Sequence, residues 1–247
     1  MTEQDRQRAI HRKLARAPEP LSRGSIVTPW PEFNRALGTG GLPRGRIVEV
    51  FGPSGSGKTT VALHVAASVQ KNGGAAAWID AEHAFDPAYA VSLGVALGGL
   101  PVAQPETAEQ AFEIARHLVA SGALDLLVID SAAALVPALE LETELGAASA
   151  GLHSRALTSG LQKLARAVAK GDVTVLFLNQ VRSRPDVSGG AETTAGGPSL
   201  KLYAALRVAL DADSGRIRFR VLKNKPAEAF RQGELRLESG AESSECP

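Results

Sequence analysis

Short apolar segments alternate with helix-patterned segments between residues 46 and 178. The apolar segments read RIVEVF, AAAWID, LLVID and VTVLFLN. Between them lie TTVALHVAASVQ, TAEQAFEIARHLVA and RALTSGLQKLARAVA, whose apolar residues recur with helical spacing. Strands that are apolar throughout need cover on both faces, which parallel β–α–β units provide. The alternation therefore predicts an α/β fold with a mostly parallel sheet flanked by helices.

The helical segment that begins near residue 107 carries its own start and stop signals. Thr107 is placed as the N-cap, Gln110 stands at the capping-box position, and Gly122 follows the last turn. These signals support the strand and helix alternation.

The hydrophobic period changes to two after the loop of residues 182–198. Ile217, Phe219 and Val221 alternate with arginines after the turn residues 213–215, which predicts an antiparallel hairpin. The run ELRLE, residues 234–238, is expected to extend this hairpin. No internal repeat is found in the chain.

The two ends of the chain differ from the core in pattern. Residues 1–17 suit a basic helix around Ile10 and Leu14, either solvated or acting as an arm that packs on a neighbouring subunit. Residues 21–45 are rich in Pro and Gly and are expected to be mainly connection, and the tail SGAESSECP is expected to be disordered. We therefore expect a basic helix and linker at 1–23, a core at 24–238 and a tail at 239–247.

Composition and charge exclude several classes of protein. The 247 residues suffice for one large α/β domain or two small ones, and 27 basic against 26 acidic side chains give a net charge of +1, so any nucleic-acid site must be local. A single cysteine, Cys246, excludes a disulfide framework and a Cys-based zinc site. The absence of a leader and of a membrane-length apolar run predicts a cytoplasmic protein.

The strongest chemical motif is GPSGSGKT, which matches the phosphate-binding pattern G-x-x-x-x-G-K-[ST] between a strand and a helix. Its glycines let backbone N–H groups face a phosphate, Lys58 supplies a cation, and Thr59 supplies a hydroxyl for Mg²⁺. A turn without a ligand is the alternative. The residues expected to bind nucleotide are Gly52, Pro53, Ser54, Gly55, Ser56, Gly57, Lys58, Thr59 and Thr60.

Acidic side chains follow two other predicted strands. Asp130 ends LLVID, where its carboxylate would hold Mg²⁺ through water. After AAAWI comes DAEHAFDPAY, in which Glu82 is suited to orient and deprotonate a water. Asp80 and Asp86 suit capping or ion pairing as well as they suit a functional role. Tyr89 either stacks on a base or packs half-buried.

Asn179 and Gln180 end the last apolar strand, before a glycine-rich loop. Their amides either sense a phosphate or make strand-end hydrogen bonds. Long loops of this kind in compact domains are usually functional or disordered.

Together these motifs resemble the bacterial RecA recombinase family. GRIVEVFGPSGSGKTT, WIDAEHAFDPAYA, VIDSAAALVP, NQVRSRP, ETTAGG, LKLYAALR and VLKNKPAEAFRQGE follow one another in the family's order, from about residue 24 to residue 234. DAEH, KNK and ETTAGG distinguish this set from P-loop kinases, GTPases and helicases. The resemblance implies a RecA-type P-loop NTPase core with a twisted, mostly parallel sheet, ATP bound between adjacent subunits of a filament, and single-stranded DNA along its axis.

The resemblance also implies roles for individual residues. Glu82 corresponds to the family's water-activating carboxylate, Gln180 to its γ-phosphate sensor, and Lys223 and Lys225 to the pair that reaches a neighbouring subunit's ATP. With Lys58 these form the implied catalytic set, and Asp86 and Tyr89 are the implied adenine contacts. Two loops, residues 142–151 and 182–198, are the implied DNA loops. The implied DNA contacts are Arg155, beyond the first loop, and, within the second, Arg182, Arg184, Thr193, Thr194, Gly196 and Gly197.

Departures from the family pattern bear on DNA handling. Ala150 and Leu202 stand where the family has bulkier residues, and the second loop carries Pro185 and Asp186 and lacks its apolar cluster. The stretch before GTGGLPRGR is shorter, and the chain stops where the family continues into a further domain. Wedges that unstack bases need apolar bulk, so weakened strand exchange is expected.

Three functions remain open at this point. The first is a DNA-dependent ATPase that forms filaments on single strands for recombination and repair. The second is a RecA-derived accessory protein of DNA-damage mutagenesis that acts by protein contacts. The third is a stand-alone P-loop phosphotransferase, which is disfavoured because no acceptor site or Arg-rich lid is apparent.

Overall fold

The computed structural model describes residues 24–141, 151–182, 193–213 and 216–236. The helix expected at residues 1–17, most of the first loop, most of the second loop and the tail lie outside the described residues. All seven of the expected strands and helices between residues 46 and 178 are present. They are β3 (Ile47–Gly52), α3 (Lys58–Lys71), β4 (Ala76–Asp80), α5 (Ala108–Ala120), β6 (Leu126–Asp130), α7 (Leu152–Val168) and β7 (Thr174–Arg182).

Two short strands, β1 (Ser25–Ile26) and β2 (Leu42–Pro43), pair with each other. The other described strands form one mixed sheet in the order β11-β10-β9-β3-β7-β6-β4-β5, with the short β8 (Thr193–Thr194) paired to β7. The pairings of β3, β4, β5 (Val102–Ala103), β6 and β7 are parallel, and β9 (Leu206–Asp213) also runs parallel to β3. Then β10 (Arg216–Asn224) and β11 (Gln232–Leu235) add antiparallel strands at one edge. The predicted α/β class, the mostly parallel sheet and the hairpin are confirmed.

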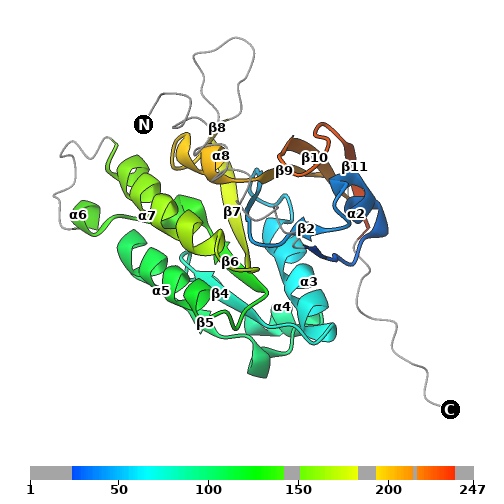
Figure 1. Ribbon diagram of the computed structural model, residues 1–247, viewed down its shortest axis with the longest axis horizontal. Helices are drawn as coiled ribbons and strands as arrows, with labels where there is room; N and C mark the ends of the chain where they lie inside the picture. The colour runs from blue at the N-terminus through cyan, green and yellow to red at the C-terminus, as the bar shows by residue number, and fades with distance from the viewer. Residues whose placement is uncertain (1–23, 142–150, 183–192, 214–215, 237–247) are drawn as a thin grey trace, which may run out of the picture.

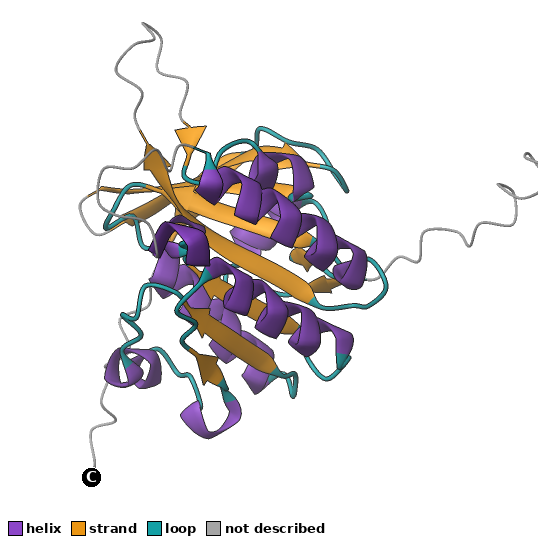
Figure 2. Cartoon of the chain, turned by 90° about the vertical axis from the view of Figure 1, so that its left-hand side faces the viewer, coloured by secondary structure: helices purple, strands orange, loops and turns teal. Residues whose placement is uncertain are grey.

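Helices cover both faces of the sheet, as the apolar strands require (Figure 1). One core lies against α3 and contains alternate residues of each strand, such as Val48 and Val50 of β3. The other lies against α5 and α7 and contains the intervening residues, such as Ile129 of β6 and Phe177 of β7. Figure 2 shows α5 and α7 lying across that second face. Side chains on either side of every central strand are therefore excluded from water.

Residues 24–45 hold more regular structure than their composition predicts. They contain β1 (Ser25–Ile26), α2 (Pro31–Leu37) and β2 (Leu42–Pro43), elements that the expectation of mainly connection did not include. The proline stands at the first helical positions, where its missing N–H does no harm. Phe33 packs edge-to-face on Phe219 with ring centroids 4.8 Å apart, and the Trp30 indole donates to the Arg236 carbonyl. This helix thus clamps the antiparallel strands onto the sheet.

The start of α5 forms as predicted, with one difference. The Thr107 hydroxyl accepts the N–H of Gln110, while the Gln110 side chain accepts the N–H of Glu106 rather than that of Thr107. The remaining short helices are α4 (Pro87–Ser92), α6 (Ala138–Leu141) and α8 (Ser199–Tyr203), with 3₁₀ turns at Leu97–Gly99 and Ala132–Ala134. Among the described residues no helix has the length and apolar character to cross a membrane.

Candidate nucleotide-binding site

The phosphate-binding motif forms a tight loop between β3 and α3. Gly55 and Gly57 adopt left-handed backbone conformations, with φ of 75° and 81°, and a Cβ on Gly57 would collide with Ile217. The Lys58 ammonium donates to the carbonyls of Gly52 and Pro53 at 3.2 and 2.7 Å, and burial lowers the pKa of Lys58. Carbonyl groups of the loop therefore hold the Lys58 ammonium at the amino end of α3, where a phosphate would bind.

Thr59 and Asp130, the two residues expected to serve a metal ion, lie in contact. The Thr59 hydroxyl donates to the Asp130 carboxylate at 3.0 Å. Burial raises the pKa of Asp130 to about 6. Both are hard oxygen donors of the kind Mg²⁺ prefers, so the pair fits that ion. In the described part of the chain no cluster of three or more His, Cys, Asp and Glu side chains offers a competing metal site.

Glu82 lies on the loop after β4, beside the end of β6. The N–H groups of Ala81 and Glu82 both donate to the Asp130 carbonyl, at 2.7 and 3.3 Å. The Glu82 carboxylate is exposed, and its Oε1 accepts hydrogen bonds from the Ser131 hydroxyl at 2.5 Å and from the Gln180 amide at 3.3 Å. Three strand ends, those of β4, β6 and β7, therefore bring their polar residues together.

The other acidic residues of this loop organise its backbone. Asp80 is 2% exposed and accepts hydrogen bonds from the N–H groups of Ala84 and Phe85 and from the Gln104 amide. Asp86 caps α4 by accepting the N–H groups at positions 88 and 89. Asp86 therefore caps a helix, and Asp80 holds the backbone of the loop that follows β4.

Tyr89 is partly exposed and lies against the first turn of α3. Its ring is 40% exposed, and its hydroxyl lies 2.7 Å from the hydroxyl of Thr60 in the first turn of α3. The hydroxyl contact thus holds a half-exposed ring next to the phosphate loop. The adenine contacts assigned to Asp86 and Tyr89 stay predictions.

A buried polar network behind the site was not anticipated from the sequence. Asn179, which is fully buried, donates to Glu49 at 2.9 Å and to the Ala195 carbonyl at 3.1 Å. Glu49 forms a buried ion pair with Arg207, whose guanidinium lies 4.6 Å from the centre of the Phe51 ring. A lone charge inside the apolar strand RIVEVF was the one available signal. The network explains why Asn179 is structural here while Gln180 faces the site.

Lys223 and Lys225 are not brought to the phosphate loop. Lys223 pairs across β9 with Arg207, which pairs with Glu49 of β3, three residues before Gly52 where the loop begins. This is about 10 Å along the strand, at ~3.3 Å per residue. The Lys223 ammonium instead donates to the carbonyls of Lys201 and Leu202, and burial together with neighbouring cations, Lys225 foremost, lowers its pKa.

The described residues around the two expected DNA loops lie close to one another. Gly196 and Gly197 have left-handed backbones and abut the first turns of α7, so that a Cβ on Gly197 would meet the Ser154 hydroxyl at 2.7 Å. Arg155, in the same turn, is exposed. Thr194 is 8% exposed, and its backbone pairs with Val181 of β7. The backbone of Thr193 pairs with Arg182 of the same strand. Arg184 lies outside the described residues.

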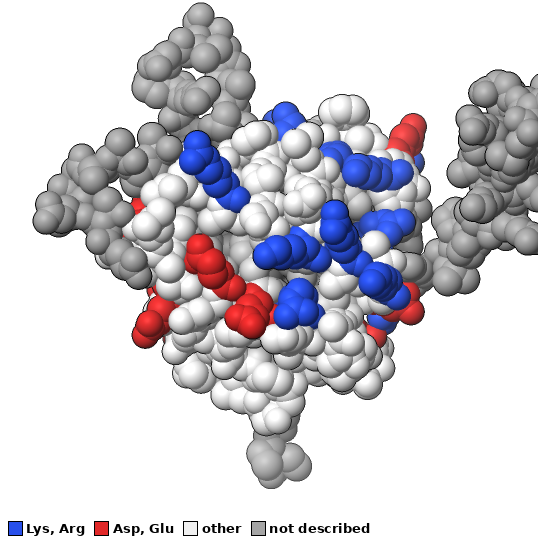
Figure 3. Space-filling model, turned by 60° about the vertical axis from the view of Figure 1, so that its left-hand side comes forward, with Lys and Arg blue, Asp and Glu red and all other residues white. Residues whose placement is uncertain are grey.

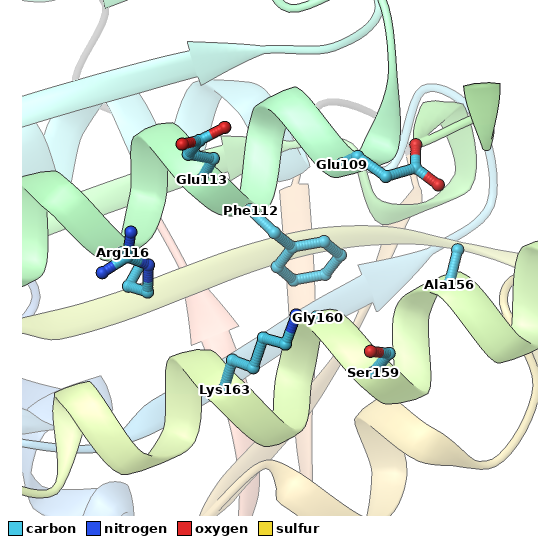
Figure 4. A pocket seen from close by; sticks show the side chains of 8 residues that line it. All are labelled: Glu109, Phe112, Glu113, Arg116, Ala156, Ser159, Gly160 and Lys163. Atoms are coloured by element: carbon cyan, nitrogen blue, oxygen red, sulfur yellow. The ribbon is translucent and has the colours of Figure 1, made fainter.

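A groove of about 360 Å³ runs between α5 and α7 on the other side of the sheet from α3. Phe112 forms its floor and points toward Gly160, between Glu109 and Glu113 on one rim and Lys163 on the other (Figure 4). This face of the molecule displays side chains of both charges (Figure 3). The groove contains none of the residues predicted from the sequence to bind nucleotide.

Comparison with known proteins places this geometry in a family. The RecA N-terminal domain model matches residues 19–242. The chain is 45% identical to Protein RecA of Frankia casuarinae, over 96% of this chain and 76% of that protein. It is 44% identical to Protein RecA of Symbiobacterium thermophilum, over 93% and 73%, and 50% identical to that of Clostridium acetobutylicum, over 87% and 65%. The chain belongs to the RecA family.

Proposed function

We propose that this chain is a RecA-type DNA-dependent ATPase that binds single-stranded DNA and assembles with copies of itself into filaments for homologous recombination and DNA repair. The observation that carries the proposal is the convergence of Glu82 and Gln180 beside the Thr59–Asp130 pair and the phosphate loop. Residues 24–238 form the ATPase core in this proposal, and the protein acts in the cytoplasm.

ATP would bind with its phosphates on the loop of residues 52–59. Lys58 would exchange the carbonyls it now meets for phosphate oxygens, because an ammonium interacts more strongly with an anion than with a neutral acceptor. Thr59 and Asp130 would hold Mg²⁺, Asp130 through water. The ion, when bound, neutralises charge on the phosphate oxygens. The half-exposed ring of Tyr89 would stack on the base.

Hydrolysis would use Glu82 as the group that orients a water and accepts its proton. The carboxylate is exposed, and its position is fixed by the backbone contacts of its own loop. Gln180 touches the same carboxylate and directly precedes the residues that lead into the second loop. A change in that loop would therefore reach Glu82 through a single amide.

Lys223 and Lys225 would act on the nucleotide of a neighbouring copy. Lys223 lies level with Glu49, three residues before the phosphate loop of its own chain begins, and Lys225 lies further from that loop. Lys201, Lys225 and Arg207 are close enough to Lys223 to lower its pKa, whereas the loop after β4 carries the exposed carboxylates of Glu82 and Asp86. Attraction between the lysines of one copy and the carboxylates of the next would favour head-to-tail association.

DNA would be held near the start of α7, where the described ends of both loops meet. Arg155, Arg182 and Arg184 would contact phosphates, with Thr193, Thr194, Gly196 and Gly197 contributing backbone groups. Since Ala150 and the second loop offer little apolar bulk for insertion between bases, strand exchange would be weak. The same lack of bulk favours the accessory-protein alternative, in which protein contacts matter more than DNA pairing.

The test is ATP hydrolysis with and without a single-stranded oligonucleotide. The wild type should hydrolyse ATP faster with the oligonucleotide present. Lys58→Ala should lose nucleotide binding or turnover, because the positive charge and its hydrogen bonds to the phosphate are removed together. Equal hydrolysis with and without DNA would favour the accessory role. Unchanged hydrolysis in the lysine variant would contradict the phosphate-loop assignment.

A further inference from the structure

An exposed carboxylate on a loop needs fixed partners if it is to hold a water in line with a phosphate. Glu82 has two side-chain partners, Ser131 and Gln180, and both donate to the same oxygen, Oε1. Its other oxygen, Oε2, accepts no hydrogen bond from any residue that the structure describes. The carboxylate is thus held through Oε1, while Oε2 keeps its lone pairs available to a water molecule.

Of the two donors, Ser131 is the fixed one. It is 1% exposed, whereas Gln180 is exposed. The Ser131 carbonyl accepts the N–H of Ala134 and so begins a 3₁₀ turn directly after β6. The carbonyl of the next residue, Ala132, lies 3.2 Å from the His153 ring in the first turn of α7. Strand, turn and helix together therefore set the position of the serine hydroxyl.

We propose that Ser131 is a positioning residue for ATP hydrolysis, holding the Glu82 carboxylate so that Oε2 faces the attacking water. The inference rests on the proposed function, because Ser131 would act only through Glu82. It assigns no chemistry to the serine itself. Ser131 directly follows Asp130 in sequence, so one strand end fixes both the metal-side carboxylate and the water-side carboxylate. Gln180 supplies the second, movable donor to the same oxygen.

The hydrogen bond at issue is of the strong kind, since its acceptor is an ionised carboxylate. Losing one such bond is expected to lower kcat about tenfold, the rate equivalent of a hydrogen bond to a charged group. Among the described residues Ser131 makes no hydrogen bond to the phosphate loop, so KM and nucleotide affinity should stay within about twofold of the wild type. A split between kcat and KM is therefore the first expected signature.

A double-mutant cycle separates positioning from general stability. Ser131→Ala, Glu82→Gln and the double variant are compared by single-turnover hydrolysis with single-stranded DNA present. If the serine acts through Glu82, adding Ser131→Ala to Glu82→Gln should lower the rate no further, because the group it positions has already lost its function. A serine that merely supports the fold would lower the rate in both backgrounds by the same factor.

Thr174→Val is the matched control. Thr174 is also a fully buried hydroxyl, donating to the Pro43 carbonyl at 3.1 Å, but it lies at the other end of β7 from Gln180. It should lower the thermal midpoint without lowering kcat. Ser131→Cys keeps a weak donor of similar size and should recover part of the lost rate if Ser131→Ala folds poorly.

The outcomes are distinct. A tenfold loss of kcat with unchanged nucleotide affinity, absent in the Glu82→Gln background, supports the positioning role. Full activity of Ser131→Ala in a setting where the wild type is active, or equal losses in both backgrounds, overturns the inference alone. No hydrolysis by the wild type under any condition overturns the proposed function, and the inference with it.

Discussion

At the scale of single residues, Glu82 is where the site's geometry is most constrained. Its backbone is bound to the Asp130 carbonyl and its side chain is bound by Ser131 and Gln180, yet its Oε2 remains open among the described residues. Such a group can be changed without disturbing nucleotide binding, because it does not touch the phosphate loop. Binding and chemistry should therefore separate at this position.

Replacing Glu82 by Gln should leave ATP affinity unchanged and lower turnover by roughly 10²-fold or more, since only the proton acceptor is removed. Titration with a fluorescent ATP analogue measures the affinity, and phosphate release measures turnover. A variant that binds ATP more weakly but turns over each bound ATP normally would show that Glu82 is structural.

Asp130 links the site to stability through its raised pKa. Burial raises this pKa to about 6, above the ordinary value of 3.8. Between those values the folded protein holds more protons than the unfolded chain, so the free energy of unfolding should fall as pH rises from about 4 to about 6.

At pH 7 the ionised Asp130 therefore opposes folding of the nucleotide-free protein. Asp130→Asn should raise the free energy of unfolding at pH 7 by roughly 1 to 3 kcal/mol while impairing Mg²⁺-dependent hydrolysis. Urea unfolding of both proteins at pH 5 and pH 7.5, without nucleotide, measures the change. A variant less stable than the wild type at pH 7.5 would contradict the account.

The sequence predicted those site residues that a motif specifies. Lys58, Thr59 and Asp130 follow from the phosphate-loop pattern and from the strand that ends in Asp, and they do lie together. Ser131 and Glu49 were not predicted. A serine after a strand carries no signal of its own, and a charge inside an apolar strand does not reveal its partner, because ion pairs between distant strands depend on the register of the sheet.

At the scale of elements, long periodic segments were predictable and short ones were not. Every strand and helix of the β/α alternation appears within a few residues of its expected bounds, because burial on both faces leaves an unbroken apolar pattern. The helix α2 was missed since its seven residues hold together through tertiary contacts, such as Phe33 with Phe219. Local composition does not report such contacts.

Packing of α5 on α7 depends on the small residue Gly160. A Cβ at this position would lie 2.2 Å from the Phe112 ring. Ala is favoured over Gly in a helix by about 1 kcal/mol, but overpacking of this kind typically costs 1 to 3 kcal/mol, so Gly160→Ala should be destabilising overall. Urea unfolding, with the exposed neighbour Ser159→Ala as control, provides the measurement. A Gly160→Ala protein at least as stable as the wild type would show that Phe112 moves freely.

At the scale of the whole molecule, the two lysines lie away from the phosphate loop of their own chain, Lys223 level with Glu49 of β3 and Lys225 further still. A single chain therefore does not bring all the predicted catalytic residues together. Hydrolysis per chain should rise with protein concentration, because a complete site needs two copies. A specific activity that stays constant down to dilute monomer, measured alongside light scattering, would contradict this expectation.

The lysines should be dispensable for binding and required for turnover. Lys223→Ala combined with Lys225→Ala should bind ATP as the wild type does and lose hydrolysis, because the pair serves another copy's nucleotide. Thermal unfolding checks that the double variant is folded. Loss of ATP binding by the isolated double variant would place the lysines in the site of their own chain.

The most direct measurement mixes two inactive proteins. Glu82→Gln supplies intact lysines but no carboxylate, and the variant with both lysines replaced supplies the carboxylate but no lysines. In an equal mixture about one quarter of head-to-tail junctions would combine an intact Glu82 with intact lysines, so hydrolysis should return to about a quarter of the wild-type rate. No recovery, although light scattering shows mixed assemblies on single-stranded DNA, would contradict a site shared between two copies of the chain.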